Sequence, residues 1–254
     1  MLKKIFLTVF GILIGGALIV LLTIRLIVNQ PLPVGESGPA AEALADRIEA
    51  ATAQQAWRDT AAVEFTFDRR GNKHFYDKRR HLIEVIAPGE KTIRVLYNHK
   101  NQNQFVAFAD GNRLSGAEAH AALQQAIKFH VNDVFWLNPF GALRAPGAKL
   151  ALVGERALLI TYESGGVTPG DSYLIITDEN GRPERWQMWV SVLPIRGLEF
   201  TFEDWKTYET GAVLSTTHNG SIAQVNLSGV KTYAQYPAPG EADRFAPLLE
   251  NAEP

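Results

Sequence analysis

His74, Asp77 and His81 carry side chains of the kinds that bind metal ions or transfer protons. In an extended strand, residues of opposite parity face opposite sides, so His74 and Asp77 diverge. Asp77 and His81 share a side, but they lie about 13 Å apart at about 3.3 Å per residue. Because the ligands of one zinc ion must all lie within about 2 Å of it, the spacing favours exposed strand residues. We predict no metal site and no bound cofactor.

Three further polar residues are candidates for a site. His130 ends an apolar helical stripe, a position more typical of a core or rim histidine than of a ligand. Asp133 either lines the mouth of a cleft with Trp136, or it ends the helix while Trp136 joins the core. Asp171 enters a strand after Pro-Gly, where a turn carboxylate accepting backbone N–H bonds is the favoured interpretation. We take Asp133 and Asp171 as candidate polar residues at a cleft mouth.

The motifs of the common catalytic sites are missing from the sequence. There is no nucleophile elbow, no His-Glu-x-x-His pair and no phosphate-binding glycine loop. The chain has no cysteine, which excludes a thiol nucleophile, a disulfide, a thiolate metal site and a lipidated cysteine. The sequence therefore predicts no catalytic residue.

Composition and charge narrow the class of protein further. The 254 residues include 25 Lys and Arg against 27 Asp and Glu, for a formal net charge of -2. This balance, with no strongly basic block, argues against nucleic acid as a partner. Hydrophobic residues make up 46% of the chain, which is enough for a sizeable core.

The N-terminal region has the pattern of a membrane anchor. Residues 5–24 carry no charge, which is about the length needed to cross a bilayer. Lys3 and Lys4 precede this run, so the positive-inside rule places residues 1–4 in the cytoplasm and the rest outside it. We predict a single-pass anchor at residues 5–28, with a cleaved signal peptide as the alternative.

The remaining chain divides into a linker, a folded domain and a tail. Residues 29–39 contain three prolines and two glycines and predict an extended spacer. Residues 40–236 form the folded domain, which begins with a helix over residues 40–57. The proline- and acid-containing tail, 237–254, is expected to be loosely held.

The folded domain is predicted to be α+β and mainly β. Alternating hydrophobicity predicts short strands at residues 63–67, 74–80, 82–87, 92–98, 104–109, 150–154, 157–163, 172–177, 185–192, 198–202, 213–218 and 222–233. Between the two groups of strands, a helix begins at Ser115 with Glu118 in a capping box. Its apolar stripe runs along Ala119, Ala122 and Ala126 towards residues 133–137.

One curved antiparallel sheet, an unclosed barrel, can wrap its apolar face around that central helix and leave an apolar cleft between them. We expect large apolar side chains from both elements to line this cleft. The candidates are Phe65, Phe67, Phe135, Trp136, Trp186, Met188, Phe200 and Phe202.

Several local motifs occur together in the domain. They are Trp57, HFYD at 74–77, NDVFWLNPF at 132–140, PGDSY at 169–173 and Trp186. The set resembles an uncharacterised bacterial family of exported proteins whose expected fold is similar to the lipoprotein-localisation carriers. The resemblance implies a curved sheet, capped by helices, that holds acyl chains inside.

Together these features favour a domain anchored in the bacterial cytoplasmic membrane that lies in the periplasm and binds a lipid or acyl chain. Its partners would be the membrane and that ligand. One alternative is an accessory module that binds a protein of an envelope complex. A third is a hydrolase-type enzyme using Asp133, Asp171 or a histidine as acid or base.

Overall fold

The computed structural model describes residues 10, 15–16, 29–164, 170–192 and 195–250. The predicted anchor at residues 5–28 therefore lies outside the described residues, apart from Phe10, Gly15 and Gly16. Within the described ranges, no helix is both long enough and apolar enough to cross a membrane.

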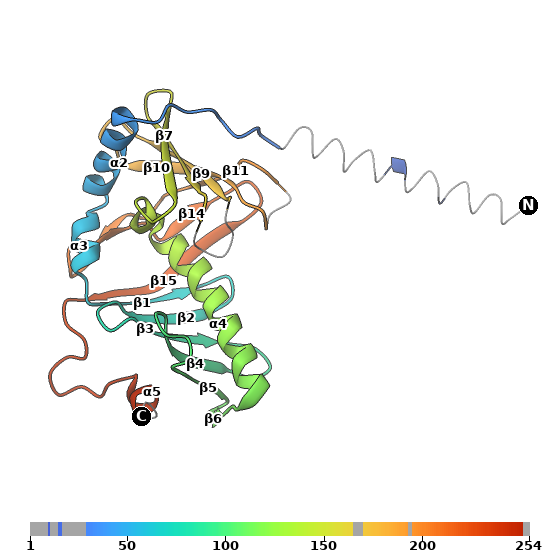
Figure 1. Ribbon diagram of the computed structural model, residues 1–254, viewed down its shortest axis with the longest axis vertical. Coiled ribbons are helices and arrows are strands. Elements are labelled where there is room, and N and C mark those ends of the chain that lie inside the picture. Colours follow the sequence, from blue (N-terminus) through green and yellow to red (C-terminus); the bar gives the residue numbers. More distant parts are fainter. Residues whose placement is uncertain (1–9, 11–14, 17–28, 165–169, 193–194, 251–254) are drawn as a thin grey trace, which may run out of the picture.

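Two antiparallel sheets form most of the domain (Figure 1). The larger sheet has eight strands in the order β14-β15-β1-β2-β3-β4-β5-β6. Their bounds are β1 Ala62–Phe67, β2 Asn72–Asp77, β3 Leu82–Ala87, β4 Ile93–Asn98, β5 Phe105–Ala109, β6 Asn112–Arg113, β14 Thr217–Asn219 and β15 Gln224–Tyr233. The second sheet has five strands in the order β11-β10-β9-β8-β7. They are β7 Ala148–Val153, β8 Ala157–Tyr162, β9 Ser172–Thr177, β10 Pro183–Trp189 and β11 Leu198–Thr201, and a small pair is formed by β12 Lys206–Thr207 and β13 Val213–Leu214.

The two large sheets meet edge to edge at β11 and β14. Two isolated bridges, Phe200 with Gly220 and Glu203 with Thr217, join these edges. The predicted single curved sheet is thus two hydrogen-bonded sheets with a short junction. The mainly β, antiparallel and unclosed architecture is as predicted.

Helix α4, Gly116–Leu137, runs across both sheets (Figure 1). Its first half covers β3, β4 and β5, and its last turn enters the core beneath the second sheet. Ser115 is the N-cap residue but makes no side-chain capping hydrogen bond, so the predicted capping box does not form. A short 3-10 helix, η1 Pro139–Ala142, follows because Pro139 cannot continue the α-helical hydrogen-bond ladder.

The predicted helix over residues 40–57 is divided in two. Helix α2 spans Pro39–Ala51 and helix α3 spans Gln54–Asp59. Between them Ala53 adopts a left-handed conformation with φ 47°, which ends the first helix and redirects the chain. Ala41, Leu44, Ala45 and Ile48 of α2 are fully buried, so α2 covers one edge of the core.

Both ends of the described chain pack on the outside of the sheets. Both backbone polar groups of Gln30 form hydrogen bonds. Its N–H donates to the carbonyl of Arg196, and its carbonyl accepts from the indole N–H of Trp189. In the tail, which was expected to be loose, helix α5 spans Ala246–Leu249. Its neighbour Phe245 is fully buried against the outer face of the larger sheet, which holds this part of the tail in place.

Candidate functional site

The two halves of α4 present different side chains to the sheets. In the first half, three of the positions that pack towards β3, β4 and β5 are alanines, namely Ala119, Ala122 and Ala126, and they alternate with Leu123, Ile127 and Phe129. In the last turn they are replaced by Phe135, Trp136 and Leu137. An alanine side chain ends at Cβ, so the first half leaves space above the sheet that the second half fills.

That space is a cleft of about 540 Å³ between α4 and the larger sheet. Its volume falls in the range of small-molecule sites, about 300–1,000 Å³. Most of its lining is apolar. The lining residues are Val85, Ala87, Pro88, Gly89, Lys91, Ile93, Val95, Ala109, Leu114, Glu118, Ala121, Ala122, Gln125, Ala126 and Phe129.

Polar side chains occur only at the exposed rim of this lining. Lys91 lies beside the Pro88-Gly89 turn, and Glu118 and Gln125 lie on the solvent side of α4; all three are exposed. Val85 and Val95, at the bottom, are 1% exposed. The cleft therefore has an apolar floor and a polar rim, which suits a ligand with one apolar and one polar end.

A buried polar network lies on α4 immediately beyond the cleft. The carboxylate of Asp133 is fully buried. Its Oδ2 accepts hydrogen bonds from Nε2 of His74 at 2.9 Å and from Nδ2 of Asn72 at 3.0 Å. Its Oδ1 accepts from Arg70 at 2.5 Å and from Asn132 at 2.7 Å. Asp133 thereby fastens α4 to β2 and to the turn before it.

These contacts determine the charge of Asp133. Burial alone raises the pKa of its carboxyl group, but the hydrogen bonds from His74, Asn72 and Asn132 outweigh it, and the net pKa lies below the usual value. Asp133 is therefore ionised at neutral pH. Because an ionised carboxylate can only accept hydrogen bonds, Nε2 of His74 must carry a proton.

His130 extends the network by one ring. Its Nδ1 lies 3.4 Å from Nδ1 of His74, which is long for a hydrogen bond. Burial, together with the neighbouring His74, sets the pKa of His130 well below its ordinary value, although Asp133 acts in the opposite direction. His130 is therefore neutral at pH 7. Further ring contacts run from His130 through Tyr76 to His99 and His81.

The polar residues predicted from sequence have separate locations. As the strand geometry predicted, His74 and Asp77 diverge: His74 binds Asp133 on the inner side, while Asp77 accepts hydrogen bonds from Arg80 on the turn that follows. The prediction that they are exposed is wrong, because both are 1% exposed and find hydrogen-bond partners in the interior. Strand β2 ends at Asp77, whereas the sequence predicts a strand that continues to residue 80. His81 therefore lies in the turn after the strand, with φ 60°. No group of three metal-ligating side chains occurs within the described part of the chain.

The two candidates for a cleft mouth both lie in the interior. Asp133 is enclosed by the network rather than lining the cleft, because four donors surround it. Asp171 is 4% exposed and accepts a hydrogen bond from the backbone N–H of Ser191, at the end of β10. Asp171 thus binds a backbone N–H, as the turn interpretation requires, although that N–H belongs to a distant segment.

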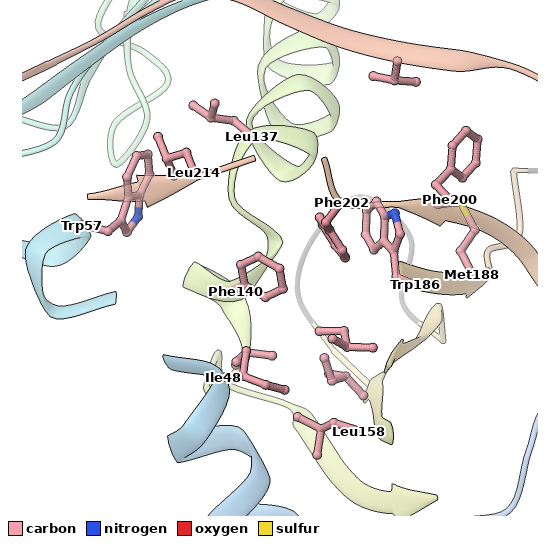
Figure 2. Packing of buried hydrophobic residues seen from close by; sticks show 14 of the residues in the cluster. Ile48, Trp57, Leu137, Phe140, Leu158, Trp186, Met188, Phe200, Phe202 and Leu214 are labelled. Carbon is pink, nitrogen blue, oxygen red and sulfur yellow. The ribbon is translucent and has the colours of Figure 1, made fainter. Parts of the chain in front are cut away.

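The eight large apolar residues proposed as cleft lining all belong to the main core cluster. Figure 2 shows four of them, Trp186, Met188, Phe200 and Phe202, among other buried side chains of that cluster. Phe65, Phe67, Trp186, Met188, Phe200 and Phe202 are all under 5% exposed, and Phe135 and Trp136 pack against them. The ring centroids of Trp136 and Trp186 are 5.1 Å apart, and those of Trp186 and Phe202 are 5.4 Å apart. The described lining of the 540 Å³ cleft includes none of the eight.

The sequence predicts an apolar cleft beside this helix. The 540 Å³ cleft lies beside the first half of α4, whereas the eight residues proposed as lining lie in the main core with its last turn. The alanine stripe at 119, 122 and 126 was the available signal, since small side chains facing β-branched ones cannot fill an interface. The pairing of His74 with Asp133 joins residues 59 positions apart. No local pattern reports a contact of that kind.

Comparison with known proteins adds little to this geometry. No protein-family model and no curated protein matches the chain. Among solved structures, the chain is similar to a DUF1329 family protein from Desulfovibrio piger, with 9% sequence identity and a TM-score of 0.36. The similarity covers 82% of this chain and 97% of that chain. Function must therefore be argued from the site itself.

Proposed function

We propose that this domain binds the acyl chain of a lipid or fatty acid in the cleft between the first half of α4 and strands β3 to β5. The observation that carries the proposal is the cleft itself: about 540 Å³ of space with an almost entirely apolar lining. Its lining extends along α4 from Glu118 to Phe129, a rise of about 16 Å at about 1.5 Å per residue. An elongated ligand matches that outline better than a compact one.

Burial of apolar surface supplies the binding energy. Each methylene removed from water contributes about 0.8 kcal/mol. Part of this gain is offset by the cost of ordering the ligand. The polar end of the ligand remains at the rim, near Lys91, Glu118 and Gln125, where water is available.

We further propose that residues 5–28 anchor the domain on the outer side of the bacterial cytoplasmic membrane. This proposal is supported by the uncharged run at residues 5–24 and the lysines before it. Because Gln30 is already hydrogen-bonded to the second sheet, the domain would begin within a few residues of that anchor. The cleft lies on β3 to β5, whereas Gln30 is bound to Trp189 and Arg196, beside β10 and β11. Figure 1 shows these two groups of strands at opposite ends of the domain. It would therefore face the periplasm rather than the anchoring membrane.

Photocrosslinking tests the proposed ligand in the full-length chain. Membranes containing the protein are incubated with a fatty acid that carries a diazirine and an alkyne, irradiated, and digested for mass spectrometry. We expect crosslinks on β3, β4, β5 and the first half of α4. Ala122→Leu, which fills the cleft, should reduce them about tenfold, since losing two methylenes of burial costs about 1.6 kcal/mol.

Ala117→Leu is the matched control because Ala117 lies on the same helix, is exposed and does not line the cleft. It should leave crosslinking unchanged. Crosslinks confined to residues 5–28, or equal loss in both variants, would show that the cleft does not hold the probe. A protein segment crosslinked at the cleft instead would favour the accessory-module alternative.

A further inference from the structure

A second, smaller pocket lies where α3, η1 and the turn after β2 meet. Its volume is about 240 Å³. Its lining residues are Trp57, Arg58, Thr60, Tyr76, Lys78, Arg79 and Gly141. Unlike the large cleft, this pocket has three cationic side chains and no carboxylate among the described residues that line it.

Two of the three cations have no carboxylate partner among the residues that the structure describes. The ammonium group of Lys78 donates a hydrogen bond to the carbonyl of Trp57 and lies 4.3 Å from the centroid of that indole ring. Arg79 is exposed and forms no ion pair. Arg58 pairs with Glu49 at 3.3 Å. The pocket therefore has an excess of positive charge that its own side chains leave unneutralised.

The indole N–H of Trp57 is an additional donor beside this charge. It has no hydrogen-bond acceptor in the described chain. A Cβ placed on Gly141 would lie 3.2 Å from Nε1, so the absence of a side chain at Gly141 keeps space open next to the N–H. Every polar group that points into this space without a partner is thus a donor or a cation.

We propose that this pocket binds a phosphate group. A phosphate brings about 1.5 to 2 negative charges and three strong acceptor oxygens, which matches two unpaired cations and one free N–H. Arg79 provides the planar fork that contacts two phosphate oxygens, and Lys78 provides a point charge. The site is separate from the acyl cleft, so it extends the proposed function without depending on it.

The electrostatics of Lys78 suit a site that accepts an anion. Burial lowers the pKa of Lys78 to about 8, although Asp59 acts in the opposite direction and Arg58 in the same direction. A lysine held away from water without a carboxylate contact is destabilised in its charged form. A bound phosphate would supply the absent counter-charge and raise that pKa.

Isothermal titration of the full-length chain, in neutral detergent and phosphate-free buffer, tests the site with two probes. One is inorganic phosphate and the other is the soluble lipid dihexanoyl phosphatidic acid. We expect saturable binding that weakens about tenfold in Arg79→Gln, because one charge-assisted contact is lost. Arg69→Gln is the matched control, since Arg69 is also exposed and lies outside the pocket.

The titrations answer two questions: whether the site binds phosphate, and whether that phosphate is a free ion or a lipid headgroup. Binding of inorganic phosphate that depends on Arg79 supports a free phosphate ligand, and binding of the lipid alone with that dependence supports a headgroup. Trp57→Phe, which keeps the ring but removes the N–H, should also weaken binding. If neither probe binds, or if Arg69→Gln and Arg79→Gln have equal effects, the proposal is overturned.

Discussion

The two halves of α4 lie against sheets of the same kind, yet one interface is open and the other is filled. Over β3 to β5 the helix borders a cleft of about 540 Å³ with the small side chains of Ala121, Ala122 and Ala126. In its last turn it presents Phe135, Trp136 and Leu137, and the rings of Trp136 and Trp186 are in contact. The difference indicates that side-chain volume, rather than backbone topology, decides where this fold leaves open space.

The buried network stands at the boundary between the two interfaces. Asp133 binds His74 of β2, and Phe129, one helical turn before it, is the last residue of the cleft lining. A buried, hydrogen-bonded carboxylate of this kind adds little net stability compared with apolar packing, but it is satisfied only when the helix and the strand are in one register. We infer that the network fixes the position of α4 so that the alanines stay above the cleft.

The largest expected effect is in the filled interface. Trp186→Ala should lower the free energy of unfolding by about 4 kcal/mol, because it removes a fully buried ring from close-packed neighbours. Phe129→Ala in the cleft should cost about 1 kcal/mol, since that ring is half-buried beside empty space. Urea unfolding of both variants measures the difference. Equal losses would mean that the cleft is as well packed as the core.

The next largest effect is at the boundary. Asp133→Ala should lower the free energy of unfolding by about 3 kcal/mol, because His74, Asn72 and Arg70 lose their shared acceptor. Asp133→Asn keeps the shape and one acceptor oxygen, so it should cost less. Denaturant titration at pH 7 compares the two. A loss below about 1 kcal/mol in the alanine variant would show that the network does not hold the helix.

Much of the fold could be predicted from local patterns. The strands from residue 63 to 109 and from 150 to 233 follow period-two alternation, and the helix over 116–137 follows its alanine and leucine stripe. The break at Ala53 was missed because alanine is the strongest helix former and gives no sign of a left-handed residue. The packing of the tail was not predicted because its few large apolar residues, Phe245, Leu248 and Leu249, stand in a proline- and acid-containing segment, and only the tertiary contact shows that Phe245 and Leu248 are buried.

The candidate sites could be predicted less well for a physical reason. Large aromatic residues draw attention in a sequence, but they fill space, and a cleft forms where side chains are small. The residues that make the cleft, such as Ala122 and Ala126, look ordinary. Likewise Asp133 and His74 show that a buried carboxylate is recognised by its distant donors, and no spacing along the chain contains that information.

The boundary network also predicts how stability depends on pH. The pKa of His130 lies well below its ordinary value in the folded protein, chiefly through burial. In the unfolded chain it is near 6.5, so the unfolded state binds more protons below that pH. Burial likewise lowers the pKa of His218, to about 4. Stability should therefore be full above about pH 6.5 and fall below it, by at most about 1.4 kcal/mol per pH unit for each histidine.

The groups facing His130 are His74 and Tyr76 of β2, Asp133 of α4 and His99, so replacing His130 tests the network in place. His130→Gln should reduce the slope of stability against pH between 6.5 and 5, measured by urea unfolding at several pH values. His120→Gln is the control, because His120 lies on the exposed side of α4. The ionised carboxylate of Asp133 also contributes to stability. Because its pKa is lowered, this contribution is lost only at a more acidic pH, below about pH 4.

Adding a side chain should have effects of opposite sign in the two regions, the smaller of them in the cleft. Ala45→Leu adds a side chain to the packed core beneath α2, where Ala45 is fully buried, and should destabilise the fold by about 2 kcal/mol. Ala122→Leu adds the same atoms to the open cleft and should stabilise it by about 0.5 to 1 kcal/mol, since apolar surface is covered without strain. Alanine and leucine have similar helix propensities, so the backbone contributes little to either change. Paired thermal and urea unfolding experiments measure both signs. If Ala122→Leu destabilised the protein as much as Ala45→Leu, the space beside α4 would be too small for an added side chain, and a ligand could not enter it either.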